Sequence, residues 1–142
     1  MSRAIASRKR LLRVRDVQHS QAVAAVVTAR DEAAQIADNA ARIAKVRSEL
    51  FGDPEITSGA SLATRRELAS RLERAGRQLD GALYDANLRI DARDAERIVA
   101  DRDREIAERL KDKAQAAREA LREKRLQALP SYRRMQVKGT EE

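Results

Sequence analysis

Apolar residues recur every three or four positions along much of this chain, which is the spacing of one face of an α-helix. The first such run extends from Ala22 to Leu50 without a break. Its members Ile36, Ile43 and Leu50 are seven residues apart, as in the seam of a coiled coil. Upstream the pattern is looser but still partly apolar. It predicts a first helix over about residues 4–51.

A second apolar stripe follows residues 52–60, a segment containing Gly, Pro and Ser that predicts a loop. Its steps of eight around Ile98 depart from heptad spacing and predict local unwinding of a supercoil. The members of this stripe are Leu68, Leu72, Ala75, Leu79, Leu83, Ala86, Ile90, Ile98, Ile106, Leu110, Ala117 and Leu121.

Residues at both ends of this stripe set the expected limits of the second helix. Thr64 opens a capping-box sequence, and Ser61 is an alternative cap. Pro130 lacks the N–H that would continue the hydrogen-bond pattern. We therefore expect a second helix over about residues 61–129 and a tail over residues 130–142.

The two stripes predict an all-α fold in which two long helices form an antiparallel coiled-coil hairpin, the second helix being longer. With a turn centred near residue 56, the numbers of facing residues add up to about 112. Ile36 then faces Gly76, whose missing side chain lets the helices approach closely. The same register leaves residues 109–129 as a single helix. One domain covers residues 1–142.

Composition supports an extended helical protein rather than a globular core. Charged residues make up 37% of the chain, whereas Leu, Ile, Val and Phe together make up about a fifth. The absence of cysteine excludes disulfides and thiol chemistry and fits a reducing compartment. No apolar run has the length of a membrane span, so we expect a cytoplasmic protein.

Positive charge is concentrated at the two ends of the sequence. The net charge is +5 over residues 1–20 and +6 over residues 109–134, whereas it is −3 over residues 21–108. A hairpin brings these ends to one basic pole suited to an acidic partner. Nucleic acid is another partner for such charge, but only one Phe and two Tyr are available for stacking on bases. Solubilising charge is the third interpretation.

No motif for catalysis, phosphate binding or metal binding is present in the sequence. His19 is the one histidine, and its place in a helical pattern favours a surface or seam position. Acidic residues such as Asp101 and Asp103 alternate with Arg102 and Arg104, which is typical of a solvated helix face. We expect no enzyme activity, no cofactor, no metal and no small-molecule substrate.

The order of elements resembles the FliJ family of flagellar export proteins and their counterparts in virulence secretion. The resemblance covers residues 10–130. It implies an antiparallel coiled coil similar to the central stalk of rotary ATPases, located in the cytoplasm at the inner face of the membrane with the export apparatus. It rests on the segments Leu11-Leu12-Arg13-Val14-Arg15, Glu49-Leu50-Phe51, Thr57-Ser58-Gly59-Ala60 and Leu68-Ala69-Ser70-Arg71-Leu72-Glu73-Arg74-Ala75.

The resemblance implies two sets of site residues, because this family binds the ring-forming export ATPase with the pole that holds both termini and touches the export gate membrane protein near the loop. The ATPase-binding residues would be Arg8, Arg10, Arg13, Arg15, Arg118, Arg122 and Arg125. The gate-binding residues would be Asn39, Ile43, Val46, Leu50, Leu68, Leu72, Ala75 and Leu79. Most of the second set also belong to the apolar stripes, so a purely structural role is the alternative for them.

We therefore expect a non-enzymatic stalk and adaptor of the type III export ATPase, which promotes ATPase assembly and activity and couples it to the gate. Export chaperones are further candidate partners. The alternative is a basic coiled coil that binds nucleic acid or has a structural role. Pairing of the helices within one chain or between two chains, and a flagellar or a virulence-type system, are all compatible with the sequence.

Overall fold

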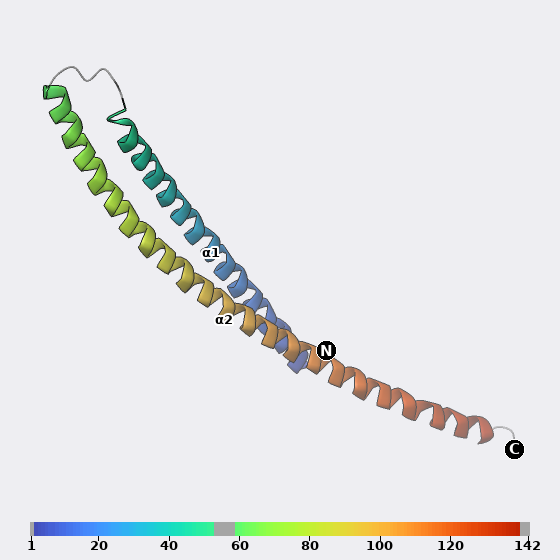
Figure 1. The fold of residues 1–142 in the computed structure, drawn as a ribbon. Helices are drawn as coiled ribbons and strands as arrows, with labels where there is room; N and C mark the ends of the chain where they lie inside the picture. Colours follow the sequence, from blue (N-terminus) through green and yellow to red (C-terminus); the bar gives the residue numbers. More distant parts are fainter. Residues whose placement is uncertain (1, 53–58, 140–142) are drawn as a thin grey trace. The chain divides into compact units, whose positions relative to one another are not determined.

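The computed structural model describes residues 2–52 and 59–139 and contains two long helices. Helix α1 covers Arg3–Glu49 and helix α2 covers Gly59–Gly139, and the described residues include no strand (Figure 1). The two helices pack against each other, which confirms the predicted all-α helical hairpin. Of the expected loop, residues 53–58 lie outside the described part of the chain.

Contacts group the chain into two compact units, each built from part of α1 and part of α2. Unit 1 combines Met1–Ser20 with Val99–Glu142, and unit 2 is the continuous segment Gln21–Ile98. Within unit 2, Ile43 and Arg47 of α1 contact residues of α2 in the reverse order, so the two helices are antiparallel there. The hairpin therefore joins residues that are far apart in sequence.

Both ends of the first helix lie within two residues of the predicted limits. The carbonyl of Ser2 accepts a hydrogen bond from the N–H of Ala6 at 3.2 Å, so helical bonding starts with the first residues of the chain. At the other end, the N–H of Leu50 bonds to the carbonyl of Arg47, and the N–H of Gly52 bonds to that of Glu49. Both hydrogen bonds span three residues instead of the four of an α-helix, so they tighten the last turn. They also satisfy carbonyls that the end of an α-helix leaves free.

The predicted capping box at the start of α2 is wrong. The helix begins at Gly59, so both Ser61 and Thr64 lie inside its first turns. The Thr64 hydroxyl donates a hydrogen bond to the carbonyl of Ala60 at 3.0 Å, four residues back. A threonine whose hydroxyl donates to the carbonyl four residues earlier is compatible with a helix interior. Thr64 therefore bonds to a carbonyl within the helix and does not cap the helix start.

The predicted end of α2 at residue 129 is also wrong, because the helix continues through Pro130 to Gly139. Proline cannot donate a hydrogen bond to the carbonyl of Leu126. Leu126 is 52% exposed, so water can reach this part of the helix and hydrogen-bond the carbonyl that proline leaves free. The cost of the missing bond is therefore smaller here than in a buried helix.

The core of unit 2 consists of small side chains. Val26, Ala29 and Ala33 of α1 and Ala86 of α2 are all less than a tenth exposed. Among the described residues, no large side chain is completely buried. Small residues let two helices approach closely and fill the space between them without voids. Because little apolar area is removed from water per residue, this packing contributes less stability than a globular core of similar length.

The pairing register differs from the predicted one by about seven residues. Gly76 lies opposite Ile43, and Arg47 forms an ion pair with Glu73, so the numbers of facing residues add up to 119 or 120 rather than 112. The first turns of α2 extend past the end of α1 in Figure 1. The prediction assumed a symmetrical turn, whereas the connection between the helices is long enough for α2 to start further out.

The two helix-interior glycines of α2 have different surroundings. A Cβ atom built on Gly76 would lie 3.9 Å from Cγ2 of Ile43, which is ordinary van der Waals contact. Gly76 is therefore in the seam as predicted, but the approach of the helices leaves room for alanine. A Cβ atom on Gly81 would meet nothing within 4 Å, so no close contact requires this glycine.

The seam of α2 keeps its heptad spacing where the sequence predicted steps of eight. Ile98, Ile106 and Leu121 are all more than a third exposed, so they are not seam residues. In unit 1 the partly or fully buried positions among the described residues of α2 are Ala100, Asp103, Arg104, Ala107, Leu110, Lys111, Ala114 and Gln115. Alanines and the aliphatic stems of basic residues fill this seam, and a search for large apolar residues overlooks both.

Candidate functional site

Unit 1 brings together the two basic segments that lie near opposite ends of the sequence. Its part of α1 contributes residues 3–20, and its part of α2 starts at Val99. All of the residues that the family resemblance assigns to ATPase binding belong to this unit, namely Arg8, Arg10, Arg13, Arg15, Arg118, Arg122 and Arg125. The structure therefore places both predicted groups in one unit, while their binding of an ATPase stays a prediction.

Among the described residues, two ion pairs and one histidine–carboxylate contact join α1 to α2 within unit 1. Nε of Arg104 lies 2.7 Å from a carboxylate oxygen of Asp16. Nη1 of Arg15 lies 3.3 Å from Asp103, and Nε2 of His19 lies 3.4 Å from Asp101. The side chains of the two arginine pairs are more than a third exposed, so each pair is worth about 0.5 kcal/mol. Together these pairs favour this register over others.

The interpretation of the alternating charges as a solvated face fits Asp101 and Arg102, which are exposed, but not Asp103 and Arg104, which are half-buried. Asp101, Asp103 and Arg104 point toward α1 and hold partners there. The sequence left a surface or a seam position open for His19, and its side chain, only 22% exposed, lies in the seam. Arg15 is already paired with Asp103, and it also donates a hydrogen bond to Gln18. Among the predicted ATPase-binding residues, Arg15 is therefore the one that the described structure pairs with a carboxylate of the opposite helix.

A hollow of about 350 Å³ lies where the first turns of α1 meet α2. Ile5 at its base is 3% exposed, and its rim is mostly basic. The lining residues are Ile5, Lys9, Gln115, Arg118, Glu119 and Arg122. An apolar base with a basic rim suits a partner side chain that has an apolar stem and an acidic end, such as glutamate.

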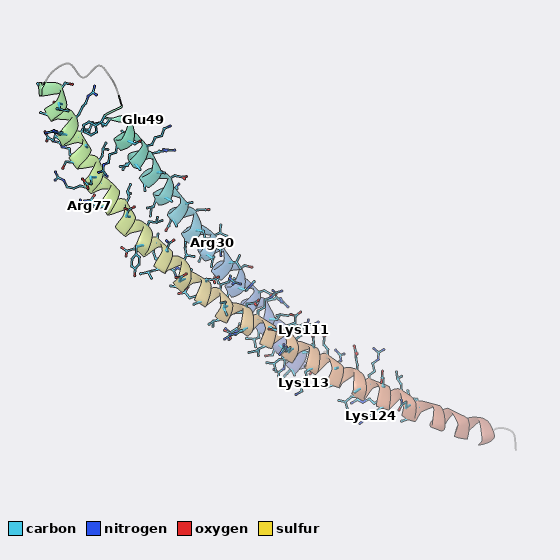
Figure 2. All side chains as sticks on the ribbon, viewed as in Figure 1. Arg30, Glu49, Arg77, Lys111, Lys113 and Lys124 are labelled. Carbon is cyan, nitrogen blue, oxygen red and sulfur yellow. The ribbon has the colours of Figure 1, made fainter. Side chains whose placement is uncertain are left out.

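Beyond this hollow, the described side chains of α2 are exposed to solvent. Every residue from 116 to 129 is exposed, including Arg118, Arg122 and Arg125. Figure 2 shows Lys124 on this stretch of α2, past the start of α1. The predicted single helix therefore exists, but it begins about seven residues later than residue 109 because of the change in register. Within the described part of the chain, its three arginines form no ion pair.

The residues that the resemblance assigns to gate binding divide into two groups in unit 2. Asn39, Val46 and Leu68 are exposed. The other residues are half-buried along the seam between the helices: Ile43, Leu50, Leu72, Ala75 and Leu79. The exposed group is available to a partner, whereas the seam group stabilises the hairpin.

Glu73 is the centre of a small charge cluster in unit 2 that the sequence did not indicate. Nη2 of Arg77 donates a hydrogen bond of 2.9 Å to one of its carboxylate oxygens. Nη2 of Arg47, from α1, lies 3.7 Å from the other. The hydrogen bond from Arg77 is the main cause that lowers the pKa of Glu73 below its ordinary value of 4.5, and the positive charge of Arg47 adds to it.

The described residues contain neither a metal-binding cluster nor a membrane-spanning helix. No group of three or more His, Cys, Asp or Glu side chains there is arranged to hold a metal ion. No helix in the same part of the chain combines the length and the apolar composition that crossing a bilayer requires.

The cross-helix partners Asp16, Asp101, Asp103 and Glu73 were missed because their roles depend on the register. Each belongs to a run of mixed charge, and such a run is usually exposed to solvent. The charges themselves contain the signal, because Arg15 pairs with Asp103 and Asp16 pairs with Arg104 across the seam. Reading that signal requires the antiparallel pairing to be known within one turn.

Comparisons of this chain with protein-family models, with curated proteins and with solved structures found no match. The likeness to flagellar export proteins therefore rests on the segments quoted from the sequence. The functional conclusion below depends on the charge and exposure of the described residues.

Proposed function

We propose that this protein is a non-enzymatic stalk and adaptor of a type III protein export ATPase. The observation that carries the proposal is the joining of both basic segments in unit 1, together with a stretch of α2, residues 116–129, in which every residue is exposed. Arg118, Arg122 and Arg125 on that stretch are exposed and available to acidic groups of a partner.

Binding of unit 1 to the inner surface of an ATPase ring gives the proposed mechanism. Arginine and lysine side chains pair with acidic groups of the ring, and partner side chains enter the hollow above Ile5. A helical hairpin that touches the ring subunits unequally binds their nucleotide states with different affinity. Such differential binding shifts the states and promotes assembly and hydrolysis.

The coupling of the ATPase to the export gate is assigned to unit 2. Asn39, Val46 and Leu68 are its exposed candidates for contact with a gate membrane protein. In this proposal the protein acts in the cytoplasm, at the inner face of the membrane, and has no chemistry of its own. Export chaperones are additional partners.

Nucleic-acid binding is the second candidate, because the same exposed arginines would pair with phosphates. Titrations with the purified export ATPase and with double-stranded DNA, at several salt concentrations, separate the two functions. The stalk function predicts that reversal of Arg118, Arg122 and Arg125 to Glu abolishes ATPase binding. A steep loss of DNA affinity with salt, together with no ATPase binding by the unmodified protein, would replace the stalk by the nucleic-acid function.

A further inference from the structure

Unit 1 exposes an apolar face among its described residues. Four of its large apolar side chains are between 39% and 56% exposed: Leu11 and Val14 on α1, and Val99 and Ile106 on α2. Leu11 and Val14 are three residues apart, and Val99 and Ile106 are seven apart, so each pair shares one face of its helix. We call these four residues the apolar face.

The ion pairs show that both halves of the apolar face lie on the same side of the seam. Arg15 with Asp103 bridges one side, and Asp16 with Arg104 bridges the other, since consecutive residues of a helix are about 100° apart. Leu11 lies one turn before Arg15, and Val14 is turned away from Asp16. On α2, Val99 and Ile106 lie one turn to either side of Asp103. All four therefore flank the Arg15–Asp103 side.

The register also aligns the two halves along the helix axis. Val14 and Ile106 have numbers that add up to 120, the same as for Asp16 and Arg104, so they lie at the same level. From the level of Leu11 to that of Val99 the face covers about ten residues of helix, or about 15 Å. Half-buried Leu110 lies on α2 just beyond the level of Leu11. The face thus has the length of about three helical turns.

The edges of the apolar face are basic. Arg10 lies one turn from Val14, Arg102 one turn from Ile106, and Lys113 two turns from Ile106. Each of these three side chains is exposed, and none forms an ion pair within the part of the chain that the structure describes. A second copy would oppose its own basic edges to these, which is unfavourable. Phosphates of a nucleic acid would gain nothing from the apolar centre.

We propose that the apolar face binds an amphipathic helix of another protein, with its apolar stripe between α1 and α2 and Asp or Glu along its flanks. This is helix-in-groove recognition, in which the bound helix contacts the groove with apolar residues at positions i, i+3 or i+4, and i+7. The two partners are assigned to different surfaces. The ATPase is assigned to the exposed stretch of α2 over residues 116–129, whereas the amphipathic helix binds the apolar face beside the seam. The inference therefore does not depend on the stalk function.

The test uses the full chain and two labelled synthetic helical peptides of about 14 residues, the length of about four turns. Both carry Leu and Ile at heptad spacing; one has Glu on its flanks and the other has Lys. Fluorescence anisotropy should show binding of the Glu peptide, and about tenfold weaker binding or none for the Lys peptide. Ile106→Ser and Arg102→Glu should each weaken binding of the Glu peptide by about tenfold.

Val27→Ser is the matched control, because Val27 is as exposed as Val14 but lies in unit 2. It should leave binding unchanged. Circular dichroism checks that each variant keeps its helical content. Equal affinity for the two peptides, no binding of either, or no effect of Ile106→Ser would overturn the inference. A doubling of mass at high concentration that Ile106→Ser abolishes would assign the face to a second copy and overturn it too.

Discussion

At the scale of single residues, one step along α1 separates a buried side chain from an exposed one. Val26 is 3% exposed, whereas its neighbour Val27 is 52% exposed. We expect Val26→Asp to lower the free energy of unfolding by about 3 kcal/mol or more, because it buries a charge without a partner. Val27→Asp should cost less than about 1 kcal/mol. Urea unfolding followed by circular dichroism measures both, and equal losses would show that the seam lies elsewhere.

Another residue-scale prediction concerns the pH dependence of Glu73. Its pKa is below 4.5 in the folded protein, so it binds protons less readily there than in the unfolded chain. Its contribution to stability is therefore complete above the unfolded pKa and is lost as the pH falls through the folded one. Carboxyl NMR titration should show a pKa below 4.5 that rises in Arg77→Ala, and rises less in Arg47→Ala. An unchanged pKa in Arg77→Ala would contradict the assigned cause.

At the scale of elements, the sequence was enough to predict both helices, because their apolar spacing is long and regular. It was not enough to predict the register. A stripe with heptad spacing looks the same after a shift of seven residues, so Gly76 can be placed opposite Ile36 or Ile43 with the same faces in contact. Position along the seam depends on the connection between the helices and on ion pairs such as Arg47 with Glu73.

Cysteine pairs test the register directly, since the natural chain has no cysteine. The pair Ile43→Cys with Gly76→Cys should form a disulfide under mild oxidation, because a Cβ at position 76 would lie 3.9 Å from the Ile43 side chain. The pair Ile36→Cys with Gly76→Cys should stay largely reduced. Electrophoresis without reductant distinguishes the outcomes. Closure of the second pair instead would establish the register of 112, and dimers linked by the first pair would place the helices in different chains.

At the scale of the whole molecule, the joining of two distant basic segments was predictable from the break and the charges alone. The details of the site were not. Which arginines are free depends on partners across the seam, so Arg15 is paired with Asp103 whereas Arg118 is exposed. The apolar face was missed for a related reason: Ile106 was assigned to the seam because it is large and apolar, and the actual seam residue nearby is Ala107.

The central claim is that the free arginines of α2 act on an export ATPase. Its most direct test is the rate of ATP hydrolysis by the purified ATPase with and without this protein. The account predicts stimulation by the unmodified chain and its loss in the triple variant Arg118→Glu, Arg122→Glu, Arg125→Glu, with helical content unchanged. Reversal of Arg42, Arg66 and Arg74, three exposed arginines of unit 2, changes the net charge equally and should preserve stimulation. The claim would be contradicted if the rate of ATP hydrolysis were the same in three cases: with the unmodified chain, with the triple variant, and with the ATPase alone.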